Sequence, residues 1–243
     1  MSYAVPLVVP THKPVLSNQE FRRILINKRM NSSVVFVIPS SNFNVFNSNY
    51  GNLGEIVTLS DKFFSSRESY NRMLLSQDFW QRFLMYEKVI ICQTDATLIK
   101  PTEPLNDLNY SFIGAPWKRP HKFRIVSGEA FVDYRRHSFH PYRSLSVGNG
   151  GLSLRNVSSH LQVLRSFESN KLPLAIINGK INEDLVFSYL FKIFNFPLPS
   201  ATFAGSIFLE ETVTNLTSIP DVFGFHALSK FNPNLENMIL NSI

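Results

Sequence analysis

The sequence predicts an α/β domain with a central, mostly parallel mixed sheet that is flanked by helices. Short apolar runs of strand length alternate with amphipathic segments of helix length through the first half of the chain, and this alternation is typical of such a domain. The 243 residues are 44% hydrophobic, which supports a substantial core. Because we find no internal repeat and no low-complexity linker, we expect one domain over residues 1–243.

Apolar runs that are bounded by polar turns predict the strands. We expect strands at 4–9, 34–38, 55–59, 88–92, 110–114 and 151–154, and shorter extended segments at 207–209 and 223–227. The segment 42–54 is rich in Asn, Ser and Gly and is expected to be a loop. The segment 123–146 has no clean period, so we expect an excursion from the core there.

Capping residues and apolar spacing predict the helices. A capping box at Ser17–Glu20 begins the first helix. A later helix has two acids in its first turn, where the helix dipole favours them. The expected helices are 17–30, 67–83, one capped by Asn156 or Ser158 that runs to about Phe167, 183–194, and a last one after Pro233.

Cysteine usage and the N-terminus bear on the compartment. The single cysteine, Cys92, lies in an apolar run, so a disulfide within the chain is excluded. The first residues show no basic and apolar leader, and no apolar stretch approaches the roughly 18 residues that a membrane span needs. We therefore expect a cytoplasmic protein, with a peripheral place at the inner membrane face as an extension of that expectation.

The net charge of +6 is concentrated in one segment. Between Trp117 and Ser146 the chain carries seven basic and two acidic residues, a difference of 7 − 2 = +5. They are Lys118, Arg119, Lys122, Arg124, Arg135, Arg136 and Arg143 against Glu129 and Asp133. This basic segment is either a solvated loop or a patch that attracts phosphate groups or an anionic membrane. We find no nucleic-acid motif, so no nucleic-acid partner is expected.

Four polar islands follow one another along the chain, each beside an apolar segment. They are Gln93-Thr94-Asp95, Val147–Gly151, Asn182-Glu183-Asp184 and Gly224-Phe225-His226. The first follows a buried strand, at the place where open α/β sheets bind ligands. A glycine loop, an acid pair and a late histidine complete the set. This combination is what a metal-assisted site for a nucleotide sugar needs.

Asp95 and His226 are the candidate metal ligands. Mg²⁺ and Mn²⁺ bind carboxylate oxygens together with substrate phosphates, and a neutral imidazole can complete such a site. Lys230, four residues after His226, could reach a diphosphate as a point charge. Singly, each has an ordinary alternative: a turn acid, a hydrogen-bonded core histidine and a surface lysine.

The glycines and the acid pair also allow two interpretations. Glycine permits close approach of the backbone to a ligand, but a tight turn into a strand would use it too. The glycine segment is neither a Walker P-loop nor a dinucleotide fingerprint, because its spacing differs from both. Glu183 or Asp184 could accept the proton of an attacking hydroxyl, or both could simply be favourable first-turn acids.

These motifs resemble the GT-A class of nucleotide-sugar glycosyltransferases. More closely, the chain looks like a bacterial glycosyltransferase-like family first catalogued as a domain of unknown function. The resemblance extends from about Val5 to Lys230 and rests on residues 86–95, 110–117, 147–155, 182–184 and 224–228. It implies a GT-A-like (Rossmann-like) fold and a cofactor, Mn²⁺ or Mg²⁺, held by Asp95 and His226. The DxD-type motif is incomplete, because Gln93 replaces its first acid.

The resemblance also implies where a substrate binds. Gln93 would hydrogen-bond ribose, and Trp117 would stack on a sugar face. The implied substrate-binding residues are Pro10, Thr11, His12, Tyr70, Asn71, Gln93, Trp117, Gly148, Asn149, Gly150, Gly151 and Lys230.

The activity implied is transfer of a sugar from a nucleoside-diphosphate sugar to a hydroxyl of a glycan or lipid-linked acceptor, in bacterial surface polysaccharide or glycolipid assembly. Asp184 or Glu183 is the base if the anomeric centre inverts, and retention would give them another role. The alternative is a non-catalytic module that binds sugar nucleotides or glycans, although such a module has no need of Glu183, Asp184 and Asp95 together. A metal-dependent phosphohydrolase would need more clustered metal ligands.

Overall fold

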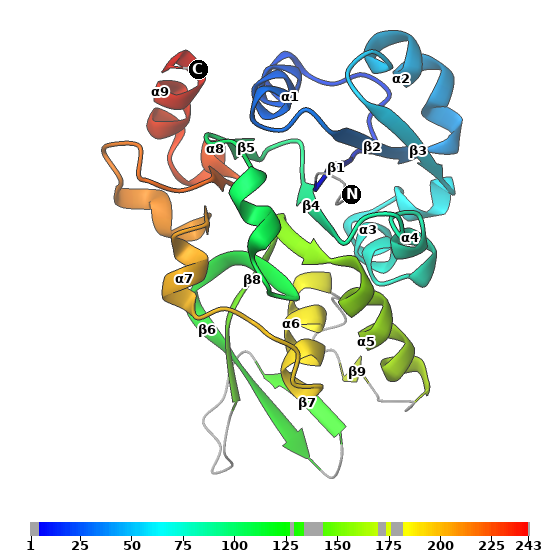
Figure 1. Cartoon of the computed structure of the whole chain (residues 1–243), viewed down its shortest axis with the longest axis vertical. Helices are drawn as coiled ribbons and strands as arrows, with labels where there is room; N and C mark the ends of the chain where they lie inside the picture. Colours follow the sequence, from blue (N-terminus) through cyan, green and yellow to red (C-terminus); the bar gives the residue numbers. More distant parts are fainter. Residues whose placement is uncertain (1–4, 127–128, 134–142, 170–173, 176–181, 243) are drawn as a thin grey trace.

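A computed structural model of the chain describes residues 5–126, 129–133, 143–169, 174–175 and 182–242 (Figure 1). Side chains are described outside 122–144 and 167–181. None of the helices in the described ranges combines the length and the hydropathy that a membrane span requires.

The main sheet has eight strands. They are β1 (Leu7–Pro10), β2 (Val34–Pro39), β3 (Glu55–Leu59), β4 (Lys88–Cys92), β6 (Phe112–Val126), β7 (Glu129–Asp133), β8 (Arg143–Asn156) and β9 (Leu174–Ala175). Their spatial order is β3-β2-β1-β4-β8-β6-β7-β9. Strands β3, β2, β1 and β4 are parallel, and β8 is antiparallel to both β4 and β6. The predicted α/β class with a mostly parallel mixed sheet is confirmed.

Helices flank this sheet, and a second, small sheet adjoins it. The helices are α1 (Asn18–Met30), α2 (Phe43–Tyr50), α3 (Arg67–Leu74), α4 (Gln77–Gln81), α5 (Val157–Ser169), α6 (Glu183–Ile193), α7 (Ala201–Gly205), α8 (Leu228–Phe231) and α9 (Pro233–Ser242). The small sheet has the order β10 (Phe208–Leu209), β11 (Gly224–Phe225) and β5 (Thr97–Leu98). In Figure 1, β6 and β7 reach away from the body at one end, and α9 lies toward the opposite end.

Two predicted helix caps are confirmed. At the start of α1, Ser17 Oγ accepts from the Glu20 N–H at 3.3 Å, and Glu20 Oε2 accepts from the Ser17 N–H at 2.9 Å. At the start of α5, Asn156 Oδ1 accepts from the Ser159 N–H at 2.9 Å. These bonds satisfy backbone donors that a helix leaves unpaired at its first turn.

Two expectations about helices are wrong. The segment 42–54 contains α2 instead of a loop, because Phe46 packs against Phe36 and Tyr50, with ring centroids 5.1 and 4.8 Å apart. This burial outweighs the weak helix propensity of the Asn and Ser residues between. The segment 67–83 forms α3 and α4 instead of one helix, since Ser76 Oγ accepts from the Phe79 N–H at 3.3 Å and caps a new helix.

The expected glycine loop also differs from the structure, and the segment expected to leave the core contains strands. Residues 147–151 lie inside strand β8 rather than in a loop before it. Strand β6 continues to Val126 and pairs with β7 in a hairpin, so the segment 123–146 contains strands of the main sheet. Residues 127–128 and 134–142 lie outside the described residues. Of the basic segment, Lys118 and Arg119 have described side chains, and both are exposed.

Alternate residues of the parallel strands face two hydrophobic clusters. Val8 and Val35 share one cluster with residues of α3 to α6. Their neighbours Val9 and Phe36 share the other with residues of α1, α2 and α7. Successive side chains of a strand point to opposite faces, and a parallel sheet is buried on both. This explains why these strands read as continuous apolar runs.

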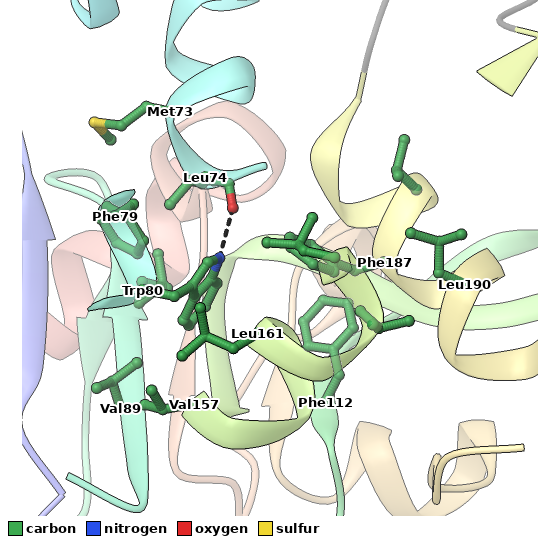
Figure 2. Packing of buried hydrophobic residues seen from close by; sticks show 14 of the residues in the cluster. Met73, Leu74, Phe79, Trp80, Val89, Phe112, Val157, Leu161, Phe187 and Leu190 are labelled. Atoms are coloured by element: carbon green, nitrogen blue, oxygen red, sulfur yellow. Dashed lines mark hydrogen bonds between the residues drawn. The ribbon is translucent and has the colours of Figure 1, made fainter. Parts of the chain in front are cut away.

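Trp80 of α4 lies in the first cluster, among Phe79, Leu161 and Phe187 (Figure 2). Its indole Nε1 donates to the carbonyl oxygen of Leu74 at 2.7 Å. The hydrogen bond satisfies the one polar atom of a side chain that is completely buried, so the ring contributes its full apolar area to the core.

His160 of α5 is buried against the same rings. Its ring centroid lies 4.1 Å from that of Trp80 and 4.4 Å from that of Phe187. Its Nδ1 lies 2.8 Å from the carbonyl oxygen of Asn156, and since a carbonyl only accepts, Nδ1 carries the hydrogen. Burial, reinforced by the positive charge of Arg155, holds the pKa of His160 well below its usual value. The folded protein therefore keeps this imidazole neutral.

We expect His160 to make the protein less stable in mild acid. Its pKa is lower in the folded than in the unfolded chain, so the unfolded state binds the proton first and stability falls below about pH 6.5. Between about pH 7 and about pH 5.5 this amounts to about 1 kcal/mol. In urea unfolding, His160→Phe should lose about 1 kcal/mol less over that interval than wild type. Equal losses in the two proteins would contradict a neutral buried His160.

Candidate functional site

The first candidate residues lie where β1 and β4 end. The two strands are parallel neighbours, so their carboxyl ends meet at one edge of the sheet. Pro10 ends β1 and is followed by the buried Thr11 and the exposed His12. Gln93 follows β4, and its N–H donates to the carbonyl oxygen of Gly151 in β8 at 2.8 Å. The first strand and the Gln93-Thr94-Asp95 motif therefore share an edge.

The register of the small sheet brings two more residues to this place, Glu210 and His226. Leu209 pairs with Phe225 in the parallel strands β10 and β11, so the next residues, Glu210 and His226, lie side by side. Phe225 also pairs with Thr97 in the antiparallel strand β5, which places His226 beside the turn that contains Asp95. The sheet thus aligns residues that are far apart in the sequence.

His226 lies between two carboxylates. Its Nε2 is 3.2 Å from Asp95 Oδ1 and its Nδ1 is 2.9 Å from Glu210 Oε2. The Nδ1 contact is an ion pair rather than a well-aligned hydrogen bond. The side chain of Asp95 is 44% exposed, whereas those of His226 and Glu210 are 14% and 13% exposed. Asp95 is thus the member of the cluster that solvent, or a ligand, reaches most easily.

The two carboxylates hold a proton on the imidazole. Burial by itself would lower the pKa of His226, but Asp95 and Glu210 outweigh it and raise the pKa to about 10. Burial would likewise raise the pKa of Asp95, but the hydrogen bond and the charge of His226 lower it. A metal ion at Nε2 must therefore displace a proton, so its affinity would rise with pH.

Gln93 connects this cluster to helix α3. Its Oε1 lies 3.1 Å from His226 Nε2, and its Nε2 donates to the hydroxyl of Tyr70 at 3.0 Å. Burial, reinforced by the charge of Glu183, raises the pKa of Tyr70 well above its usual range. The hydroxyl keeps its own proton, which it can donate to a ligand. Asn71, the next residue of α3, is buried.

Strand β8 has a bulge beside this cluster. Gly114 of β6 pairs with Ser153 and the next residue, Ala115, pairs with Asn149. The three residues Gly150–Leu152 consequently have no partner on β6. A bulge of this kind re-aims a strand and is frequent next to active sites.

The two glycines of the bulge leave space for the side chains of His226 and Glu183. A β-carbon on Gly151 would overlap the imidazole of His226. One on Gly150 would overlap the Glu183 carboxylate and would stand 3.1 Å from Cβ of Asp184. Adjacent glycines on one strand therefore bring the histidine and the acid pair close to the same backbone.

The two acids of the pair have different surroundings. Glu183 is 3% exposed, and both its oxygens accept from Arg155, at 2.8 and 2.9 Å. Asp184 is only partly buried, and its Oδ1 accepts from the N–H of Leu185 at 2.8 Å. Burial and the charge of Glu183 raise the pKa of Asp184 to about 7. Asp184 is thus the acid that can exchange a proton near neutral pH.

Trp117 of β6 and Gly148 of β8 lie next to one another, and Gly148 comes just before the bulge. Gly148 has a φ of 152°, which favours glycine, and a β-carbon there would overlap Ser188 and the Trp117 ring. Trp117 is 9% exposed and belongs to the first core cluster. Its ring also meets that of His121, with centroids 4.6 Å apart. Only a small part of this indole is left for a sugar.

Asn149 and Lys230 complete the predicted set. Asn149 is 7% exposed, and its Nδ2 has no acceptor among the described residues. A buried donor without a partner is costly, and a ligand would relieve that cost. Lys230 is exposed, and its ammonium lies 4.8 Å from the centre of the Phe231 ring. In the described part of the chain no hydrogen bond or ion pair joins its ammonium to Asp95 or His226.

Two residues of this candidate site, Glu210 and Arg155, are absent from the sequence-based prediction. Glu210 follows an extended segment just as Asp95 follows β4, so the rule that selected Asp95 could have selected it too. Arg155 follows a predicted apolar strand and resembles an ordinary surface residue in sequence, yet it is completely buried.

Asp95 and the Nε2 atom of His226 are the donors that could hold a divalent cation. Within the described residues, no group of three or more His, Cys, Asp or Glu side chains is arranged to hold a metal ion. A carboxylate and an imidazole are suitable donors for Mn²⁺, but two of them are too few. A substrate diphosphate and water would have to complete the coordination.

We expect a side chain at Gly151 to disrupt the cluster. Gly151→Ala should destabilise the protein by about 1–3 kcal/mol, because the methyl group displaces the imidazole or the strand. Gly205, at the end of α7, is the matched control, since a β-carbon there stands 3.4 Å from Pro116 Cγ, an ordinary contact. Gly205→Ala should be neutral or stabilise by about 0.4–1 kcal/mol. Equal unfolding free energies for the two variants would contradict the close packing at Gly151.

Three solved structures of known proteins resemble this chain. Mouse xyloside xylosyltransferase 1 has a TM-score of 0.51 at 9% identity, over 93% of this chain and 98% of that one. A glycosyltransferase involved in glycosylation of the major capsid of PBCV-1 has a TM-score of 0.49 at 10% identity, over 99% and 100% of the chains. A 4-diphosphocytidyl-2C-methyl-D-erythritol synthase from Anaerococcus prevotii has a TM-score of 0.42 at 12% identity, over 83% and 94%.

The first of these shares the fold, whereas the two TM-scores below 0.5 are too low to support an inference. The sequence matches no curated protein. A family model does match, over residues 54–226, which is more than half of the chain. The chain therefore belongs to the family described as a protein of unknown function (DUF5672).

Proposed function

We propose that the protein is a glycosyltransferase that moves a sugar from a nucleoside-diphosphate sugar to an acceptor hydroxyl. One observation carries this proposal: Asp95, His226 and Asp184 gather around the glycine bulge of β8, at the carboxyl end of β4. Open α/β sheets bind ligands at that edge. The fold shared with mouse xyloside xylosyltransferase 1 is consistent with it.

The charge of the site suits a diphosphate that arrives with a cation. Arg155 is paired with Glu183, so the carboxylates of Asp95 and Glu210 outnumber the remaining cation, His226. An anionic donor would be repelled by this excess unless positive charge came with it. Asp95 and His226 would hold Mn²⁺ or Mg²⁺, and the ion would stabilise negative charge on the departing diphosphate.

Glu210 would orient the histidine for that role. Histidine ligands usually present their second ring nitrogen to a carboxylate, which fixes the ring and raises its basicity. Glu210 faces Nδ1 while Nε2 faces Asp95. Gln93 Oε1 lies 3.1 Å from the same Nε2, so it holds the protonated ring, and a metal ion at Nε2 would replace this contact. Gln93 stands where the typical motif has a metal-binding acid. Its role there would be to hold the side chains of His226 and Tyr70 in place.

Asp184 would act as the general base. A base works best when its pKa lies near the working pH, and that of Asp184 is raised to about 7 by burial and by Glu183. Glu183 has both oxygens engaged by Arg155, so we assign the base role to Asp184 alone. With Asp184 as the base, transfer would invert the configuration at the anomeric carbon.

For the acceptor we propose a glycan or lipid-linked hydroxyl in bacterial surface polysaccharide or glycolipid assembly. The exposed Lys118 and Arg119 begin the basic segment after Trp117, and exposed basic side chains attract phosphate groups and anionic lipid surfaces. A cytoplasmic enzyme that docks at the inner membrane face would use them in this way.

The proposal predicts a large kinetic effect at Asp184. Asp184→Asn should lower kcat about 10²–10⁴-fold, because a general base acts in the transition state, and should leave donor affinity nearly unchanged. The measurement is release of nucleoside diphosphate from a panel of sugar nucleotides, with calorimetric donor binding beside it. Asp107→Asn, at an exposed acid, is the control and should behave as wild type. A kcat close to that of wild type in Asp184→Asn would exclude this residue as the base.

A further inference from the structure

We propose that the buried pair of Arg155 and Glu183 is a positioning element. It fastens the glycine bulge of β8 to the first turn of α6, and so fixes where Asp184 stands and which charges surround it. The catalytic consequence rests on the proposed function, whereas the physical part concerns only the contacts of these side chains.

The guanidinium of Arg155 binds on three sides. Nη1 and Nη2 donate to the two oxygens of Glu183 at 2.8 and 2.9 Å, and Nε donates to Ser153 Oγ at 2.8 Å. Nη2 also donates to the carbonyl oxygen of Gly150 at 3.1 Å, and Ser153 Oγ donates to that same carbonyl at 3.0 Å. One side chain therefore joins the backbone of the bulge to the residue that opens α6.

Burial of this ion pair costs desolvation free energy, so its presence needs an explanation. Arg155 is 0% and Glu183 is 3% exposed. Phe112 and Trp80 lie near the guanidinium, with ring centres 4.8 and 6.0 Å from its Cζ, a cation–π arrangement. Hydrophobic residues of similar volume often replace a buried ion pair without loss of stability. A pair placed beside the candidate base is therefore better explained by its effect on that base than by core stability.

The charges that face Asp184 come from three elements. Glu183 precedes it on α6, Arg155 approaches from β8 and Glu210 follows β10. Tyr70 of α3 faces the pair of Arg155 and Glu183. After burial, the charge of Glu183 has the next largest effect and raises the pKa of Asp184, whereas Arg155 lowers it. Removal of one partner should therefore shift the titration of Asp184 in one direction, and removal of the other in the opposite direction.

The test is a direct titration of the Asp184 carboxyl. Protein labelled with ¹³C at the aspartate carboxyls would be followed by NMR against pH, and the Asp184 signal identified by its loss in Asp184→Asn. Glu183→Gln keeps the shape but not the charge, and should lower the midpoint by about 1 pH unit. Arg155→Met should raise it by about as much. The acid limb of a kcat profile should move in the same directions.

A second buried ion pair provides the matched control. Arg23 Nη2 of α1 lies 2.7 Å from Glu236 Oε1 of α9, with both side chains buried. Glu236→Gln should lower stability but leave the Asp184 midpoint unchanged. Arg155→Lys separates charge from geometry, because lysine keeps the charge but not the two-pronged contact. It should leave the midpoint close to that of wild type and lower kcat more than donor affinity.

An unchanged Asp184 midpoint in Glu183→Gln would mean that the pair is only a structural contact. This result would overturn the proposal, whether or not Arg155→Met folds. A shift of equal size in Glu236→Gln would overturn it as well. Shifts in the expected directions, in a protein that transfers no sugar from any donor tested, would uphold the positioning role and reject the proposed function. The two failures are therefore distinguishable.

Discussion

The site depends on two consecutive positions of β8 that carry no side chain. At Gly151 a β-carbon would occupy the place of the His226 ring, and at Gly150 it would occupy that of the Glu183 carboxylate. The strand is bulged at the same residues, which have no partner on β6. The bulged residues approach the end of β4. Close approach of this backbone allows His226, which follows β11, and Glu183 of α6 to lie against adjacent residues of the strand.

Around this strand the protein gathers charges that a core normally avoids. Arg155 neutralises Glu183 within the core, while His226 is shared by Asp95 and Glu210. The first pair is closed, since each guanidinium nitrogen of Arg155 and each carboxylate oxygen of Glu183 has a protein partner. The second is open, with Asp95 partly exposed and an excess of negative charge. A ligand could therefore reach the open cluster but not the closed pair. Local departures from ordinary core packing are expected at a functional site.

The fold was more predictable than the site, for a physical reason. Strand β4 is a continuous buried run, so its bounds follow from local sequence. Helix α2 was missed because the packing of Phe46 and Tyr50, a tertiary effect, overrides local composition. Glu210 and Arg155 were missed because their partners are set by strand register and by a helix 28 residues farther along. No local pattern encodes such pairings, although the rule that selected Asp95 applied equally to Glu210.

We propose that the open cluster holds a donor diphosphate together with a divalent cation. Paramagnetic broadening tests it most directly: Mn²⁺ is added to ¹⁵N-labelled protein in the presence of UDP, GDP or CDP, and backbone amide signals are compared. We predict selective loss of the signals of residues 93–95, 150–151 and 226 with at least one nucleotide, and no such loss in Asp95→Ala. Broadening centred elsewhere, or identical broadening in Asp95→Ala, would show that the cation and the diphosphate do not bind at this cluster.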